Sequence, residues 1–214
     1  MTTFPPIDAE IEAAPAQAAR DTAALLESLG HEVEEADPPW RRPQLGELFT
    51  SLFAPLVMLQ VAQGRLISGR EPSSEHMEPL SWALWQLVGS MTALDAHLAS
   101  AQLEIFARGV IGWMDRYDVI VTPALSEAPV LLDDVHWQTG DPMGLFTRAG
   151  AFTPFTATAN VTGQPAISVP LAEHEGLPAA AQLFGRPADE GTLLAVAAQL
   201  EAARPWADRR PPVA

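Results

Sequence analysis

The sequence predicts an α/β fold in which a mixed β-sheet is flanked by helices. Long segments carry apolar residues at helical spacing, whereas short apolar runs bounded by Pro and Gly are typical of strands in a sheet. The chain has 214 residues, 48% of them hydrophobic and 18% charged, which is enough for a sizeable core. Residues 1–214 are therefore expected to form one domain, or a large piece of a bigger one.

Residues 1–40 are predicted to form a helix–strand unit. A helix is expected over Pro5–Gly30, with a kink or split at Pro15 and a stop at Gly30. The apolar stripe of this helix consists of Ala18, Thr22, Leu25, Leu26 and Leu29. His31–Ala36 places one apolar residue between acidic ones, which predicts a short edge strand.

Residues 41–116 are predicted to be a helical segment. The first helix is expected over Gln44–Gly64, with Pro55 disturbing its middle. The helical period then runs from Pro79 to Arg116. Because that is long for one globular helix, a break is expected at Gly89–Ser90.

Residues 117–214 are predicted to supply the strands of the sheet and the C-terminal helix. Asp118–Val121 is typical of a buried strand and is followed by Pro123, which should end it. Ala124–Phe146 contains several Pro and Gly residues with little periodicity, so a long surface loop is expected there.

Two further strands are expected to pair with each other. Ala166–Val169 has no clean polar face, so this strand should be covered on both sides and should end at Pro170. Ala179–Phe184 follows after a connection too short for a helical crossover, which predicts antiparallel pairing. Asp189 can cap the last helix. The stripe of this helix consists of Leu193, Val196, Ala197 and Leu200.

The charge of the chain and its lack of Cys exclude several classes of function. Twelve basic residues against 27 acidic ones give a net charge of −15, which disfavours nucleic acids and anionic membrane surfaces as partners. Cys is absent and the five His are scattered, so no metal site is expected. The first residues do not resemble a signal peptide, and no apolar run is judged long enough to span a bilayer. The plain expectation is a cytoplasmic protein.

One stretch carries the most specific pattern in the chain. It reads Asn160-x-Thr162-Gly163-x-Pro165-Ala166-x-Ser168-x-Pro170, then Gly176-Leu177-Pro178, Gln182-Leu183, Gly185-Arg186, Asp189-Glu190, Leu193-Leu194 and Pro205-Trp206. This order and spacing resemble the C-terminal end of the amidase signature family, and Leu26–Ala36 and Tyr117–Pro123 look like that family as well. The resemblance implies that the chain is the C-terminal portion of the amidase signature fold.

The resemblance also implies a chemistry that this chain lacks. Members of the family cleave carbon–nitrogen bonds with a Ser nucleophile, a second Ser and a Lys base, and they use no cofactor. All 12 basic residues here are Arg, and no Gly-Gly-Ser-Ser run is present. No catalytic residue is therefore assigned, and the chain alone should be inactive. Ser168 lacks a nucleophile elbow, so it is interpreted as a core residue bonded to the backbone.

Substrate contacts are the part of the family's site that this chain could retain. By the resemblance, Phe146, Phe152, Phe155 and Asn160 should approach the acyl site. The alternative is that the three Phe are core residues and Asn160 caps the Thr162-Gly163 turn. Phe152-Thr153-Pro154-Phe155, with Arg148 before it, looks most like the 6-aminohexanoate-cyclic-dimer hydrolase-like subgroup, which acts on linear or cyclic amides.

These observations leave more than one function open. The first hypothesis is the C-terminal half of an amidase, which acts on a small amide only with an N-terminal amidase half supplied by a partner or a longer frame. The second is a non-catalytic acidic domain that binds a small amide or a protein, and the third is a relic. In the first case an exposed apolar surface should remain, and it favours self-association or binding to the missing half.

Overall fold

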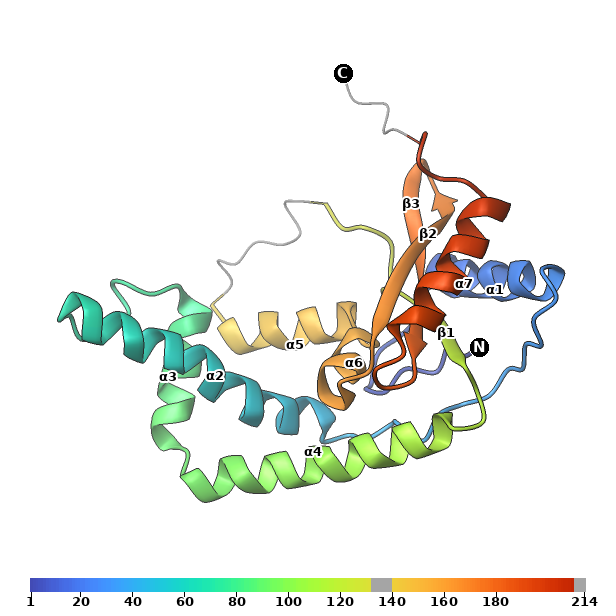
Figure 1. Ribbon diagram of the computed structural model, residues 1–214. Helices are drawn as coiled ribbons and strands as arrows, with labels where there is room; N and C mark the ends of the chain where they lie inside the picture. Colours follow the sequence, from blue (N-terminus) through green and yellow to red (C-terminus); the bar gives the residue numbers. More distant parts are fainter. Residues whose placement is uncertain (132–139, 210–214) are drawn as a thin grey trace.

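The computed structural model describes residues 1–131 and 140–209, which fold into a small sheet with helices on both faces and a helical arm to one side (Figure 1). The sheet has three strands in the order β1-β3-β2: β1 is Val119–Pro123, β2 is Ala166–His174 and β3 is Leu177–Gly185. The predicted α/β class is confirmed, and each strand pair in the described residues is antiparallel.

Strands β2 and β3 form a tight hairpin, as the predicted antiparallel pairing requires. Glu175 and Gly176 turn the chain with φ values of 52° and 79°, the left-handed geometry that suits two-residue hairpins. Contrary to the prediction, Pro170 does not end β2, because the strand continues through a bulge between Val169 and Ala172.

Helices α1 (Ala13–Ser28) and α7 (Glu190–Ala203) cover one face of the sheet. The side chain of Asp189 accepts a hydrogen bond from the Thr192 N–H, so the predicted cap of α7 is confirmed. This first core contains Leu26, Val121, Val169, Leu171, Ala181, Leu183, Leu193, Val196, Ala197 and Leu200. The stripe predicted for α7 is therefore the stripe that is buried.

Helices α4 (Ala93–Met114) and α6 (Thr156–Thr162) pack on the opposite side, around a second core. Its buried members are Trp40, Leu45, Leu103, Phe106, Val110, Met114, Ile120, Phe155 and Phe184. Ile120 and Phe184 come from β1 and β3, so this core lies on the face of the sheet that α1 and α7 leave free.

Helices α2 (Leu45–Ser68) and α3 (Pro79–Ser90) form the arm, and α5 (Pro142–Phe152) lies beside α3 (Figure 1). The predicted break between the two long helices is confirmed, because α3 ends at Ser90 and Thr92 caps α4. Pro55 lies inside α2 without ending it. The loop predicted over Ala124–Phe146 is wrong at its end, since α5 begins at Pro142; residues 132–139 lie outside the described part.

The N-terminal region corrects two predictions. The first helix begins at Ala13 rather than Pro5, and Pro15 therefore lies in its first turn, where a missing N–H costs nothing. His31–Ala36 is not a strand of the sheet, although the Ala36 N–H donates to the Met1 carbonyl at 3.1 Å. Gly30 follows the helix with φ of 94°, as the predicted stop requires.

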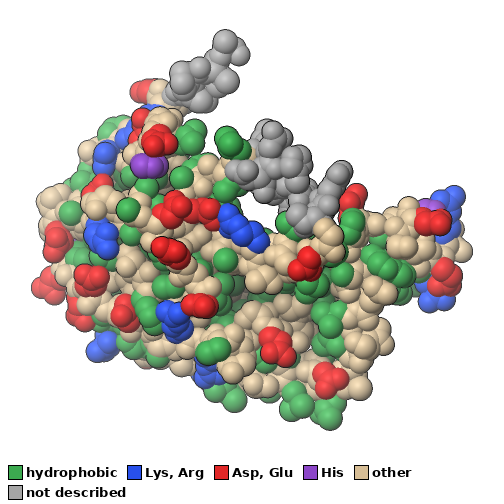
Figure 2. All heavy atoms as spheres, turned by 180° about the vertical axis from the view of Figure 1, so that it is seen from behind, with side chains coloured by type: hydrophobic (Ala, Val, Ile, Leu, Met, Phe, Trp, Pro, Cys, Tyr) green, Lys and Arg blue, Asp and Glu red, His purple; other side chains and the backbone are tan. Residues whose placement is uncertain are grey.

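Apolar side chains are exposed along the arm and at its bend. Leu56, Leu66, Ile67 and Leu94 are 60%, 84%, 88% and 65% exposed. Figure 2 shows hydrophobic side chains gathered on the arm and at the bend between α3 and α4. Helix α2 is long and apolar enough, with a mean hydropathy of 1.6, to cross a membrane. This differs from the expectation that no apolar run is long enough. Core helices of soluble proteins meet the same criteria.

Candidate functional site

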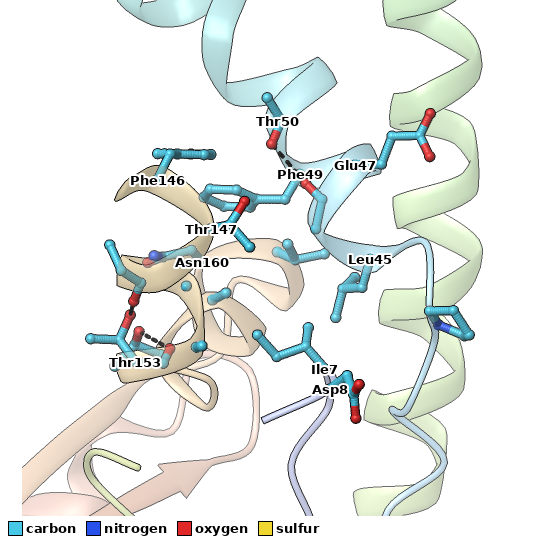
Figure 3. Close-up of a pocket in the computed structure, with 18 of the residues that line it drawn as sticks. Ile7, Asp8, Leu45, Glu47, Phe49, Thr50, Phe146, Thr147, Thr153 and Asn160 are labelled. Atoms are coloured by element: carbon cyan, nitrogen blue, oxygen red, sulfur yellow. Dashed lines mark hydrogen bonds between the residues drawn. The ribbon is translucent and has the colours of Figure 1, made fainter. Parts of the chain in front are cut away.

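A cavity of about 580 Å³ lies where the N-terminal segment, the start of α2, α5 and α6 meet (Figure 3). Its volume falls in the range of small-molecule sites. The lining residues are Ile7, Asp8, Pro43, Leu45, Gly46, Glu47, Phe49, Thr50, Met143, Phe146, Thr147, Ala149, Gly150, Ala151, Thr153, Thr156, Ala157, Asn160 and Val161. Segments far apart in the chain therefore build one concave surface.

Aromatic side chains stack across the boundary between α2 and α5. The rings of Phe49 and Phe53 lie 5.5 Å apart at an interplanar angle of 13°, and those of Phe53 and Phe146 lie 6.0 Å apart at 17°. Offset stacking of this kind adds to the area that each ring buries. Two members of the stack, Phe49 and Phe146, line the cavity, so the stack fixes the width of its apolar wall.

The hydroxyl groups at the cavity are largely used within their own helices. Thr50 donates to the Gly46 carbonyl at 2.8 Å, Thr147 to Met143 at 3.0 Å and Thr153 to Ala149 at 3.0 Å. Such bonds to the carbonyl four residues earlier occupy the hydroxyl proton. The Thr residues therefore offer a ligand methyl groups and acceptor lone pairs rather than free donors.

Asn160 is the exception among these polar groups. It lies on α6 with an exposed side chain, and among the described residues its amide has no hydrogen-bond partner. The turn after α6 is closed instead by the backbone, since Gly163, with φ of 70°, donates to the Ala159 carbonyl at 2.8 Å. The alternative in which Asn160 caps the turn is therefore not what the structure shows. An amide side chain can both donate to and accept from a ligand amide.

The two carboxylates at the cavity lie toward its margin. Asp8 pairs with Arg41 at 2.9 Å, and its side chain is 99% exposed. In Figure 3, the Glu47 carboxylate points away from Phe146 and Asn160. The wall between Phe146 and Asn160 is consequently uncharged, which suits a neutral ligand.

The four residues predicted to contact substrate separate into two groups. Phe146 and Asn160 line the cavity. Phe152 is half-buried beneath the Arg148 guanidinium at 5.7 Å, and Phe155 is fully buried in the second core. Nothing tests a role in substrate binding for any of the four, but Phe152 and Phe155 do not line the cavity, and the burial of Phe155 favours the core interpretation.

Sequence reasoning missed the contribution of α2 to the cavity. Phe49 lies within Gln44–Gly64, which was predicted to be a helix, and apolar residues at helical spacing mark a buried face without showing which element that face contacts. Thr147 follows Phe146 directly and could have been found by its position.

Groups suited to nucleophilic catalysis are not brought together in the described residues. Ser168 is exposed on β2, so its interpretation as a core residue is wrong. Ser73 and His76 share a hydrogen bond of 2.7 Å on an exposed loop, but no carboxylate is hydrogen-bonded to that imidazole in the described part of the chain. Residues 1–131 and 140–209 also hold no group of three His, Cys, Asp or Glu placed to bind a metal ion.

Comparison with protein families gives a match to the Amidase model over residues 2–194. A putative amidase AmiC of Mycobacterium tuberculosis is 34% identical over 86% of this chain and 39% of its own length. The 6-aminohexanoate-cyclic-dimer hydrolase of Pseudomonas sp. (strain NK87) is 30% identical over 99% of this chain and 44% of its own length.

Solved structures agree with these relatives. A 6-aminohexanoate cyclic dimer hydrolase, determined in complex with substrate, superimposes with a TM-score of 0.90 at 27% identity. It covers 99% of this chain, which spans 46% of that protein. A bacterial aryl acylamidase of the amidase signature family shares the fold, with a TM-score of 0.69. The chain thus spans less than half the length of the relatives that it matches.

Proposed function

The chain belongs to the amidase family, and on that premise we propose that it is the C-terminal part of a hydrolase of carbon–nitrogen bonds. By itself, this chain does not hydrolyse a substrate. The second part, supplied by another polypeptide or by a longer frame, would carry the Ser-Ser-Lys apparatus. This chain would contribute the cavity between α2, α5 and α6 as one wall of the substrate site.

The lack of a base supports catalytic incompleteness. A Ser hydroxyl becomes a strong nucleophile only when a base within hydrogen-bond reach removes its proton. The chain contains no Lys, because all 12 of its basic residues are Arg, and Arg remains protonated at any working pH. Ser168 has no hydrogen-bonded His or carboxylate in the described residues.

The substrate class is inferred from the cavity. The proposal rests on the Asn160 side-chain amide, which has no hydrogen-bond partner among the described residues and lies at the end of an apolar aromatic wall. A neutral amide with an alkyl chain matches both features, because its carbonyl and N–H can pair with Asn160 while the chain lies against Phe146. Linear or cyclic amides of 6-aminohexanoate are the candidate substrates, since two of the similar proteins are hydrolases of the cyclic dimer.

Titration of the purified chain with hexanamide, followed by NMR, tests this proposal without any partner. Saturable shifts are expected at Thr147 and Asn160. Asn160→Ala should weaken binding about tenfold, equivalent to about 1.4 kcal/mol, because a single hydrogen bond is worth about that much. Gln63→Ala is the matched control, since Gln63 is an exposed amide of α2 outside the cavity. Binding that does not saturate, or that Asn160→Ala leaves unchanged, overturns the cavity as a substrate site.

Activity assays separate this proposal from a non-catalytic binding domain. The chain alone should hydrolyse no hexanamide, and Ser168→Ala should change nothing. Turnover that Ser168→Ala abolishes would contradict catalytic incompleteness. Amide binding without turnover, even in a stable complex with a catalytic amidase part, would favour the acidic binding domain.

A further inference from the structure

Helix α4 carries two apolar stripes on opposite faces, and one of them is exposed. The buried stripe consists of Ala99, Leu103, Phe106, Val110 and Met114. Leu94, Leu98 and Ile105 are 65%, 52% and 53% exposed, and Ala101 is exposed between them. At 3.6 residues per turn, these four residues lie on the other side of the helix and form an outer stripe. In Figure 1, α4 runs along the lower border of the molecule, with the other elements on one side of it.

The outer stripe has the spacing of a coiled-coil seam. Its residues follow one another at intervals of four, three and four, as alternating d and a positions of a heptad repeat do. A helix that is apolar on opposite faces is typical of one that packs between two partners. Because α4 is already folded on its buried stripe, a second helix can pair with the outer stripe without the cost of ordering new backbone.

The polar residues that flank the outer stripe indicate which helix fits it. His97 and Glu104 occupy g positions along one flank, and Asp95 and Gln102 occupy e positions along the other; all four are exposed. When two copies of α4 pair antiparallel, g positions face g positions and e positions face e positions. His97 then meets Glu104 of the second copy, and Asp95 meets Gln102, so each flank sets an N–H donor against a carboxylate. A parallel pair would set Glu104 beside Gly109 instead.

The same register fits the apolar side chains to one another. Leu94 lies against Ile105 of the second copy, and Leu98 lies against Ala101, so two large side chains meet in each outer layer and a small one relieves each inner layer. Two-fold symmetry repeats both contacts, which gives four layers from one short stripe. Because such an interface is at the small end of the range for specific complexes, a Kd in the micromolar range is expected.

We propose that α4 is the interface of a homodimer, in which two copies of this helix pair antiparallel through Leu94, Leu98, Ala101 and Ile105. Such a dimer requires neither the cavity nor a catalytic amidase part, so it is independent of the proposed function. Each copy carries a net charge of −15, and the two copies therefore repel one another at long range. Since about 0.15 M salt screens charges that are more than about 8 Å apart, the dimer should be stronger there than at about 0.01 M.

Sedimentation of the complete 214-residue chain measures dimerisation, and Leu98→Glu tests the seam. This substitution sets carboxylates in the inner layers, so the Kd should rise at least about tenfold. Leu56→Glu is the matched control, because Leu56 is a Leu of α2 that is 60% exposed and lies outside the outer stripe. It should dimerise like the wild type, and since both side chains are exposed, both variants should stay folded. A chain that is monomeric at about 100 μM, or equal effects of the two variants, overturns the proposal.

An exchange of side chains between two positions tests the antiparallel register. Within one copy, Glu104 pairs only loosely with Arg108, at 3.7 Å, so its carboxylate can also accept from His97 of the second copy. His97→Glu sets two carboxylates against each other and should raise the Kd about tenfold. Adding Glu104→His to the same chain restores a donor opposite a carboxylate and should recover most of the affinity. A double variant that dimerises no better than His97→Glu overturns the register.

The orientation of the two helices can be measured with a single spin label, because the chain contains no Cys. In the antiparallel register, Arg108 stands opposite Met91 of the second copy. Labels on Arg108→Cys should therefore lie about 25 Å apart along the helix axis, at about 1.5 Å per residue. Parallel helices would hold the labels about 10 Å apart, and that distance overturns the proposal. A catalytic amidase part that displaces the second copy when added would also overturn it, because the outer stripe would then belong to that part.

Discussion

The rings of Trp40 and Phe155 lie 6.1 Å apart at an interplanar angle of 59°, and both side chains are fully buried. The Trp40 Nε1–H also donates to the Phe4 carbonyl at 2.9 Å. This contact joins the N-terminal segment, the chain before α2 and the start of α6. All three border the cavity, so the pair fixes the relative positions of its walls.

Replacing Phe155 with Ala should destabilise the protein by about 3–5 kcal/mol, as is typical of a fully buried Phe in a well-packed core. Chemical denaturation measures the change in the free energy of unfolding. Phe152→Ala is the control. Because Phe152 is only half-buried, this substitution should lower the free energy of unfolding by clearly less. Equal losses for the two variants would contradict the assignment of Phe155 to the core.

Gln164 connects the turn after α6 to the end of β3. Its Nε2 donates to the Gly185 carbonyl at 2.8 Å, and the side chain is 5% exposed. Gln164→Ala should lower the free energy of unfolding by about 1–3 kcal/mol, because the buried carbonyl loses its donor. Thermal or urea unfolding measures this loss, with Gln63→Ala as a control that should hardly change the free energy of unfolding. An equally small effect of Gln164→Ala would argue against this contact.

Phe146 and Phe152 offer a matched pair of substitutions within α5. Phe146→Ala should weaken binding of hexanamide about tenfold, because that ring forms part of the apolar cavity wall. Phe152→Ala should leave the affinity unchanged, since Phe152 does not line the cavity. Calorimetric titration with hexanamide measures the affinity of both variants. A larger loss of affinity in Phe152→Ala would show that the ligand binds elsewhere.

The start of α4 should respond to acid. The Thr92 hydroxyl and then the Thr92 N–H, at 2.7 and 2.8 Å, hold the pKa of Asp95 below its usual value of 3.8. A depressed pKa stabilises the folded state above the unfolded pKa, and this contribution is lost as the pH falls through the folded value. The stability difference between the wild type and Asp95→Asn should therefore be full near pH 7 and should shrink below about pH 4.

Urea unfolding at several pH values measures that difference. Thr92→Ser keeps the hydroxyl and should retain the pH dependence, whereas Thr92→Ala should reduce it. A difference that stays constant between neutral and acid pH would show that the capping box does not depend on the charge of Asp95.

Local signals explain why some elements were predictable. The cap at Asp189, the stripe of α7 and the break before Thr92 each depend on residues close together in the chain. The hairpin was predictable because its connection is too short for any other pairing. In each case the physical cause lies within the stretch that forms the element.

The errors involve features that tertiary contacts decide. Pro170 does not end β2 because it lies at an outward-facing position of an edge strand, where no ladder bond needs its N–H. The prediction that Ala166–Val169 is covered on both sides is wrong for the described chain, since Ala166 and Ser168 are exposed. The cavity wall from α2 was missed because helical spacing does not reveal which element packs against a stripe.

The short turn at Glu175-Gly176 has a consequence for the order in which the protein folds. The ladder between β2 and β3 closes over neighbouring residues, and isolated hairpins form within about 1–10 μs. The pairing of β1 with β3 joins Val119 to Gly185 across a segment that contains α5, α6 and β2, so it carries a larger loop-closure entropy. The β2–β3 hairpin should therefore form early in folding, before β1 pairs with β3.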